Sequence, residues 1–152
     1  MLAEHSTVLF GRDLERISLR GLRLFVRPID ENDREDVRAF LERHVEETPS
    51  RLSHSMNGGS TACGLLGKLL GEIVAVVGME ITDDALRIRD IIVKRELRRK
   101  WIGRVMMREA EQLAVKMDRR RLIVDDACGA QEFFRRVGFE DEGERWVRVV
   151  SS

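Results

Sequence analysis

The sequence contains no tyrosine, and of its 152 residues only 5% are aromatic and only two are cysteine. The two cysteines, Cys63 and Cys128, are too few for a disulfide framework, and neither lies in the Cys-x-x-Cys or His-rich spacing of a zinc site. These counts argue against a disulfide-bonded scaffold and a structural zinc domain. We expect both cysteines to be buried, reduced thiols, and we expect no metal.

Long apolar runs are absent as well. The longest, residues 73–79, has about seven residues including a glycine, whereas a helix that crosses a bilayer needs roughly 18 or more. The first residues lack the basic and apolar segments of an export signal. We therefore expect a cytoplasmic protein without a membrane partner.

The charges balance, with 27 lysine and arginine residues against 27 aspartate and glutamate residues. A chain without net charge has no long-range attraction to nucleic acid or anionic membranes. Three short basic runs, 98–100, 119–121 and 135–136, are able to contact phosphates, but the chain has few aromatic side chains to stack on bases. Nucleic acid is therefore not expected as a partner.

The sequence has only two prolines and no long linker, so we see no domain boundary within residues 22–152 and expect them to form one domain. Residues 1–21 precede the first predicted strand and are expected to be an N-terminal extension. The extension would be an added strand, an added helix or a dimer contact. Alternating apolar residues predict strands, and repeats at i+3 and i+4 predict helices. The predicted elements are a strand at 22–26, a helix at 37–45, an antiparallel pair at 65–70 and 73–81, a strand at 86–93, a helix at 102–117, a short strand at 122–124, a helix at 130–137 and a last strand at 144–150. This order predicts a mixed α/β fold, with one sheet and helices packed on its faces.

The segment between the strand ending at Val93 and the helix starting near Ile102 is strongly basic. Six of its eleven residues, 94–104, are lysine or arginine and one is acidic. The first N–H groups of a helix lack partners and carry the positive end of the helix dipole, so a basic strand-to-helix turn is suited to an anion. A solvated helix start is the alternative on charge alone. Gly103 lies in the first turn of the predicted helix, where a glycine lowers helix stability by up to about 1 kcal/mol relative to alanine. The close approach of a ligand or strand to the backbone would explain why a glycine stands there.

Two motifs resemble those of the GNAT acetyltransferases. The first family motif is a valine that ends a strand, four residues, and then Arg/Gln-x-x-Gly-x-Gly/Ala at the start of a helix. Here Val93 precedes Arg98-Arg99-Lys100-Trp101-Ile102-Gly103, with Trp101 at the first glycine. The second motif, Asn-x-x-Ala-x-x-Phe-Tyr-x-x-x-Gly-Phe, is matched by Ala130, Phe133, Phe134, Gly138 and Phe139. The resemblance covers about residues 65–139 and implies the GNAT acyl-CoA N-acyltransferase fold, with a central, mostly antiparallel sheet and helices on both faces.

The resemblance also implies an N-acetyltransferase that moves an acetyl group from acetyl-CoA to a primary amine by direct transfer in a ternary complex. The pyrophosphate would lie on the backbone amides of residues 99–104, and the pantetheine along the end of the strand at 86–93. The residues expected to bind acetyl-CoA are Ile91, Ile92, Val93, Arg98, Arg99, Lys100, Trp101, Ile102, Gly103, Arg104 and Phe134. We expect the Trp101 side chain to point outward, because an inward side chain would narrow or block the pyrophosphate site.

The sequence lacks the residue that often serves as the general acid in this family. Family members often place a tyrosine at the position of Phe134, and this chain has none. A thiol has a pKa near 8.5, so CoA leaves partly as a thiolate and an acid is helpful rather than obligatory. Candidate acids are Cys128 and a water held by Asp125 or Asp126, although we favour the interpretation of Cys128 as a small buried residue at a strand-to-helix turn.

The base is also unusual, because Arg87 occupies the position at which some family members have a glutamate. Asp90 and Glu80 remain as candidates, acting directly or through a water. Simple alternation places Asp90 on the same face as the apolar residues of the strand at 86–93, where burial would raise its pKa, unless a bulge inverts the alternation. A structural ion pair with Arg87 or Arg89 is the alternative role of Asp90.

Trp101, Phe134 and Arg87 all differ from the usual residues of the family at their positions. A second interpretation is therefore open, a non-catalytic GNAT-fold module that binds acyl-CoA or mediates dimerisation. A homodimer is compatible with either interpretation. The acceptor would be bound near residues 46–60 and 141–150, whose acidic side chains suit a cationic amine. The sequence does not distinguish a small amine, an amino acid, a protein N-terminus and a lysine.

Overall fold

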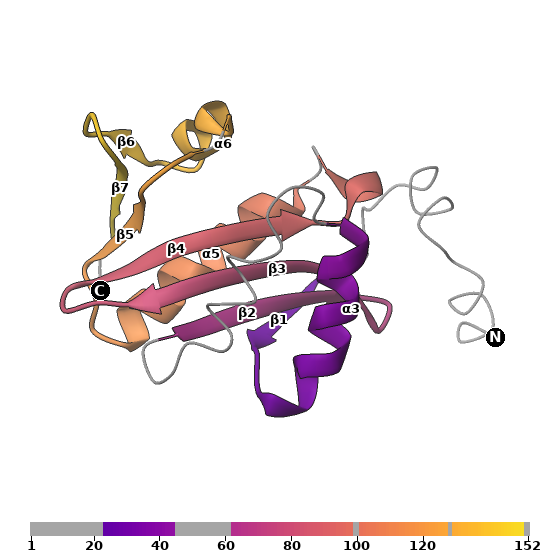
Figure 1. The fold of residues 1–152 in the computed structure, drawn as a ribbon. Coiled ribbons are helices and arrows are strands. Elements are labelled where there is room, and N and C mark those ends of the chain that lie inside the picture. The colour runs from indigo at the N-terminus through magenta and orange to yellow at the C-terminus, as the bar shows by residue number, and fades with distance from the viewer. Residues whose placement is uncertain (1–22, 45–61, 99–100, 128, 151–152) are drawn as a thin grey trace.

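One mixed sheet organises the chain in the computed structural model, which describes residues 23–44, 62–98, 101–127 and 129–150 (Figure 1). Within these residues seven strands follow the order β1-β2-β3-β4-β5-β7-β6. All neighbouring strands are antiparallel except β4 and β5. The predicted mixed, mostly antiparallel sheet is confirmed. The predicted extension, residues 1–21, lies outside the described residues.

The elements lie close to the ranges that the sequence predicts. The strands are β1 (Phe25–Pro28), β2 (Ala62–Leu69), β3 (Glu72–Ile81), β4 (Ala85–Val93), β5 (Arg121–Val124), β6 (Glu140–Asp141) and β7 (Trp146–Val149). The helices are α3 (Arg34–His44), α5 (Ile102–Lys116) and α6 (Gln131–Arg136), with 3-10 turns η1 (Glu31–Asp33) and η2 (Arg95–Leu97). The strand β6 was not predicted, because two residues are too few to show alternation. Among the described helices, none is long and apolar enough to cross a membrane.

Helices pack on both faces of the sheet, as predicted. On one face, Val77 and Met79 of β3 lie in the main core with Met106 of α5. On the other face, Val76 of β3 lies in a second cluster with Phe40 of α3. Because successive side chains of a strand point to opposite faces, α5 and α3 lie on opposite sides of the sheet. We call these sides the α5 face and the α3 face.

A β-bulge interrupts β4 at Arg89. Asp90 pairs with Gly78 of β3, but Ile88 pairs with the very next residue of β3, so Arg89 is an extra residue in β4. The bulge inverts the alternation, and Ile88 before it and Ile91 after it both pack into the core of the α5 face. Asp90 therefore lies on the α3 face. The simple alternation that grouped it with the apolar residues before the bulge is wrong.

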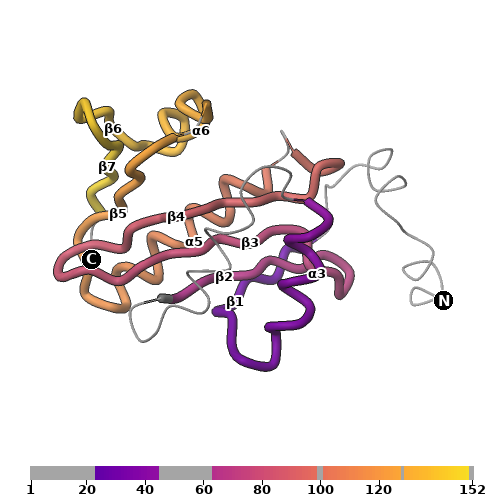
Figure 2. The backbone as a smooth tube through the Cα atoms, in the orientation of Figure 1, coloured from indigo at the N-terminus to yellow at the C-terminus, as the bar shows by residue number. Residues whose placement is uncertain are grey.

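The pairing of β4 with β5 is short. It joins Ala85–Ile88 to Arg121–Val124 and then ends, and the two strands diverge beyond that point (Figure 1, Figure 2). We call this place the β4–β5 fork. Among the described residues, no strand pairs with Arg89–Val93 on the side of β5. The middle of the sheet therefore contains a strand edge that is open to another extended chain.

The start of the α3 region is closed by its own acidic side chains. The Asp30 side chain accepts a hydrogen bond from the Asn32 amide at 2.8 Å, and the Asp33 carboxylate accepts one from the Asp30 amide at 2.9 Å. Arg27 donates to both oxygens of Asp33, at 2.6 and 2.7 Å. The hydrogen bond from Arg27, together with that from Asp30, outweighs the effect of burial and lowers the pKa of Asp33 to about 2.

The helix α6 ends as predicted, at Gly138, whose φ of 97° lies in the left-handed region. The Gly138 N–H donates to the Arg135 carbonyl at 3.1 Å and the Phe139 N–H donates to the Phe134 carbonyl at 2.9 Å, which is a Schellman motif. The Phe139 ring folds back on Phe134, with 5.3 Å between ring centroids. A β carbon on Gly138 would lie 2.1 Å from Nη1 of Arg148.

We expect Gly138→Ala to lower the free energy of unfolding by about 2–3 kcal/mol. The left-handed backbone disfavours a side chain, and the added methyl group must displace Arg148 from its 2.7 Å ion pair with Glu111. Gly143→Ala is the matched control, because Gly143 has a φ of 96° but nothing within 4 Å of an added β carbon. It should lose only about 1 kcal/mol. Urea denaturation measures both variants, and equal losses would contradict the role assigned to Arg148.

Candidate active site

The N-terminus of α5 has no capping side chain. Trp101, which precedes the helix, makes no side-chain cap hydrogen bond, and no acidic residue lies in the first turn. The Val105 N–H donates to the Trp101 carbonyl at 3.1 Å, so the N–H groups of residues 102–104 have no acceptor within the helix. Arg104 adds an exposed cation in the same turn. This end of α5 therefore combines free donors with positive charge, an arrangement suited to an anion.

Arg98 follows η2, and its side chain links the end of β4 to the end of α3. Its Nε donates to the Val93 carbonyl at 3.1 Å, and Nη2 donates to the His44 carbonyl at 3.4 Å. The Arg98 side chain, which was predicted to bind the cofactor, therefore contacts backbone carbonyls beside the start of α5. Arg99 and Lys100, which were predicted with it, lie outside the described residues.

The two sequence motifs meet at Gly103. A β carbon on Gly103 would lie 3.0 Å from Cε1 of the Phe133 ring. Phe133 belongs to α6, which follows β5 in the chain, whereas Gly103 belongs to the helix that follows β4. The Phe133 ring therefore connects the segment that follows β5 with the segment that follows β4. The close approach that the sequence indicated at Gly103 is made by a side chain of this protein.

The residues predicted to bind the cofactor are buried to different degrees. Phe134 is 3% exposed, and its ring centroid lies 5.2 Å from that of Phe133. Trp101 is partly buried and packs against the main core, so it does not point outward as predicted. Ile102 is fully buried and has only its backbone to offer. Residues 91–93 are partly buried in β4 beside the fork.

Four charged side chains form a continuous set of ion pairs at the fork. Nη2 of Arg89 donates to Glu80 of β3 at 2.9 Å, and Nη1 lies 4.0 Å from the Asp125 carboxylate, which follows β5. Nη1 of Arg87 lies 3.4 Å from the same carboxylate. We call Glu80, Arg87, Arg89 and Asp125 the fork cluster. It links three strands at the point where β4 and β5 separate.

The ion pairs of the fork cluster were not predicted. They join residues that are far apart in the sequence, so no local spacing reveals them. The one sequence feature that pointed to this cluster was the position of Asp125 directly after a buried strand. From that feature we predicted only that Asp125 holds a water molecule. The cluster became recognisable once the register of β3, β4 and β5 was known.

The structure separates the candidate acids and bases. Glu80 is bound to Arg89, so taking up a proton would break an ion pair. Asp90 is partly buried on the α3 face next to the bulge. Cys128 lies outside the described residues. Cys63 is a free thiol whose burial raises its pKa to about 11, as expected for an unreactive cysteine. No three His, Cys, Asp or Glu side chains of the described residues are grouped to hold a metal ion.

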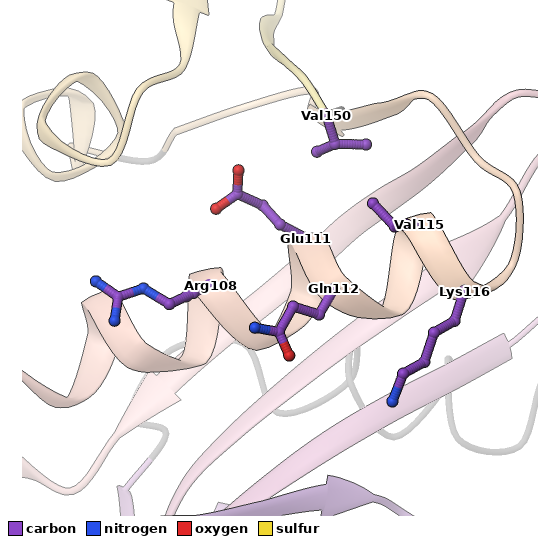
Figure 3. Close-up of a pocket in the computed structure, with 6 residues that line it drawn as sticks. All are labelled: Arg108, Glu111, Gln112, Val115, Lys116 and Val150. Carbon is purple, nitrogen blue, oxygen red and sulfur yellow. The ribbon is translucent and has the colours of Figure 1, made fainter. Parts of the chain in front are cut away.

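A groove of about 440 Å³ lies along the C-terminal half of α5 (Figure 3). Figure 3 shows its side chains projecting from the helix, with Val150 opposite Glu111. Its lining residues are Arg108, Glu111, Gln112, Val115, Lys116 and Val150. The groove adjoins neither the N-terminus of α5 nor the fork cluster, and we do not include it in the candidate site.

Comparison with known proteins gives the family. A family profile described as "Acetyltransferase (GNAT) domain" matches residues 29–149. The chain belongs to the GNAT acetyltransferase family. The membership predicted from the two motifs is therefore confirmed. No curated protein sequence gives a significant match.

Solved GNAT structures share the fold at low sequence identity. A GNAT family N-acetyltransferase from Escherichia coli, crystallised in complex with CoA, is 18% identical with a TM-score of 0.71, and the match covers 86% of this chain and 83% of that one. The ribosomal-protein-S18-alanine N-acetyltransferase from Escherichia coli is 14% identical, with a TM-score of 0.69 and coverage of 86% and 96%. A GNAT family acetyltransferase from Brucella melitensis in complex with acetyl-CoA is 11% identical, with a TM-score of 0.67 and coverage of 86% and 90%. The likeness confirms the predicted GNAT fold.

We expect Gly103→Ala to destabilise the protein when Phe133 is present and to stabilise it when Phe133 is replaced by alanine. In the first background the methyl group crowds the ring, and in the second it adds helix propensity worth up to about 1 kcal/mol. A double-mutant cycle in urea should give a coupling of at least about 1 kcal/mol. Additive effects of the two substitutions would contradict the contact between Phe133 and Gly103.

Proposed function

We propose that this protein is an acetyl-CoA-dependent N-acetyltransferase that acetylates a primary amine by direct transfer in a ternary complex. The observation that carries the proposal is the pairing of two features, the open edge of β4 at Arg89–Val93 and the uncapped start of α5. A strand edge offers hydrogen bonds to an extended amide chain, and a helix N-terminus offers donors to a phosphate. Membership of the GNAT family supports acyl transfer in general.

The residues at the fork fit an acyl-CoA. The N–H groups of Ile102, Gly103 and Arg104 would bind the pyrophosphate. The edge of β4 from Val93 back to Arg89 spans about 13 Å at roughly 3.3 Å per residue and would bind the pantetheine as an added strand. The neighbours crystallised with CoA and with acetyl-CoA support this co-substrate. In this orientation the thioester end would reach the bulge and the fork cluster.

The transfer forms a C–N bond, breaks the C–S bond of the thioester, removes a proton from the amine and returns a proton to CoA. Asp90 is our candidate for accepting the proton of the amine, directly or through a water, because it lies next to the bulge, which the thioester end would reach. A thiol with a pKa near 8.5 leaves without obligatory protonation, so the lack of tyrosine is compatible with transfer. Cys128 and a water held by Asp125 or Asp126 remain our predicted candidates for the general acid that protonates CoA.

Acyl-CoA binding without transfer is the second candidate function. Two observations favour it: the Phe133 ring already occupies the space beside the Gly103 backbone, and Arg87 stands in place of a family glutamate. Binding and turnover therefore have to be measured separately.

Calorimetric titration with acetyl-CoA and a free-thiol assay with a panel of primary amines test the proposal. We expect a micromolar dissociation constant and release of CoA that depends on the amine. Arg104→Glu should weaken acetyl-CoA binding at least about tenfold, because it places a negative charge at the helix start. Lys116→Glu is the control, since it lies about 18 Å along the helix, beyond the screening length of roughly 8 Å. It should change the dissociation constant less than about twofold.

Binding without CoA release for any amine would favour the non-catalytic module. Failure of the wild type to bind acetyl-CoA would overturn the proposal. Equal weakening by the two charge reversals would contradict the assignment of the pyrophosphate to the start of α5.

We expect Asp90→Asn to lower kcat at least about 100-fold, the scale of general-base catalysis, while the dissociation constant of acetyl-CoA stays unchanged. The rise of kcat with pH that reports the base should disappear in this variant. Glu80→Gln, measured in the same way, should retain that pH dependence. A normal kcat for Asp90→Asn would exclude Asp90 as the base.

A further inference from the structure

Arg87 places a guanidinium group at the fork, on the side of the sheet where Asp90 also lies. Arg87 precedes Ile88, whose side chain packs into the core of the α5 face, so the Arg87 side chain lies on the α3 face. Its backbone pairs with Glu80 on β3 and Ile123 on β5. Arg87 therefore lies in the last stretch of β4 that is paired on both sides, two residues before the bulge at Arg89.

The hydrogen bonding of Arg87 is incomplete. Its ion pair with Asp125 has an N···O distance of 3.4 Å, and its Nε is buried without a hydrogen-bond partner among the described residues. Arg89, by contrast, donates a 2.9 Å hydrogen bond to Glu80. A buried donor without a partner costs free energy, and an arginine presents several donors in a plane that matches a carboxylate. Because the Nη1 contact with Asp125 is long and 30% of the Arg87 side chain is exposed, the outer part of the guanidinium group has donors to offer to a further anion.

A second arginine of the same strand pair gives an internal comparison. Arg121 of β5 donates from Nε and Nη2 to the two oxygens of Asp84, at 3.1 and 3.2 Å. The side chains of Arg87 and Arg121 are equally exposed, at 30%. The pair of Arg121 and Asp84 is thus bidentate at the closed end of β4 and β5, whereas the pair of Arg87 and Asp125 is loose at the open end.

We propose that Arg87 binds a carboxylate of the acceptor, so that the substrate is a primary amine that itself carries a carboxylate, such as an amino acid. This inference rests on the proposed function, because it places the acceptor at the fork where the thioester would end. The amine would approach Asp90, and the carboxylate would bind Arg87 on the same face of the sheet. Arg87, where some family members have a glutamate, reverses the charge at this position and so favours an anionic group over a second cationic one.

The test compares L-alanine, L-methionine and L-phenylalanine with their α-amides, which lack a carboxylate, as acceptors at saturating acetyl-CoA. We expect the wild type to prefer at least one acid over its amide by about tenfold or more in kcat/KM, as a charged hydrogen bond predicts. Arg87→Gln should remove this preference by raising KM for the acid about 10- to 100-fold with little change in kcat. Arg121→Gln, the matched control, should keep the preference.

The outcomes separate this inference from the proposed function. Failure of the wild type to bind acetyl-CoA contradicts the proposed function. Binding of acetyl-CoA with equal acetylation of acids and amides, or with acetylation of amides alone, overturns the inference and leaves the function standing. Acetylation of neither series with acetyl-CoA bound also overturns it. If Arg87→Gln keeps the preference for acids, or if Arg121→Gln loses it equally, Arg87 is not the carboxylate site.

Discussion

The candidate site depends on the early end of the pairing between β4 and β5. Only Ala85–Ile88 pairs with β5, and the extra residue Arg89 begins the part of β4 that has no strand on that side. A free strand edge in the middle of a sheet is a liability unless another chain occupies it. In this protein the same edge leads from the fork cluster to the uncapped start of α5. The open edge therefore connects the candidate site of acetyl transfer with the candidate pyrophosphate site.

Helix starts and arginine pairs differ across the structure in how far their polar groups are satisfied. The α3 region closes its own N-terminus with Asp30 and Asp33, whereas α5 begins without an acid or a capping side chain. In the same way Arg121 makes a bidentate pair with Asp84, while Nε of Arg87 has no hydrogen-bond partner among the described residues. Unsatisfied groups gather along one line, from the start of α5 to the bulge. Such a distribution is expected of a site that completes its hydrogen bonds with substrates.

Much of the fold could be predicted because long elements repeat their pattern. The helix α5 and strands β3 and β4 were placed within about two residues, and Gly138 was identified as the end of α6 by its residue type. A bulge in the strand at 86–93 was considered, but its position at Arg89 could not be predicted, because apolar residues follow on both parities and leave no break in the pattern. The strand β6 was missed because it has two residues. The orientation of Trp101 depends on core residues that are distant in the sequence.

The candidate site was predictable as a segment but not as a set of contacts. The motifs located the start of α5, yet they did not reveal that Phe133 rests on Gly103 or that Asp125 approaches Arg87 and Arg89. These contacts arise from packing between separate elements. Amide hydrogen exchange by NMR, with and without acetyl-CoA, tests the central claim most directly. We expect added protection of those amides of residues 89–93 that point away from β3 and of the amides of residues 102–104. No protection there, or protection confined to the groove on the C-terminal half of α5, would contradict the account.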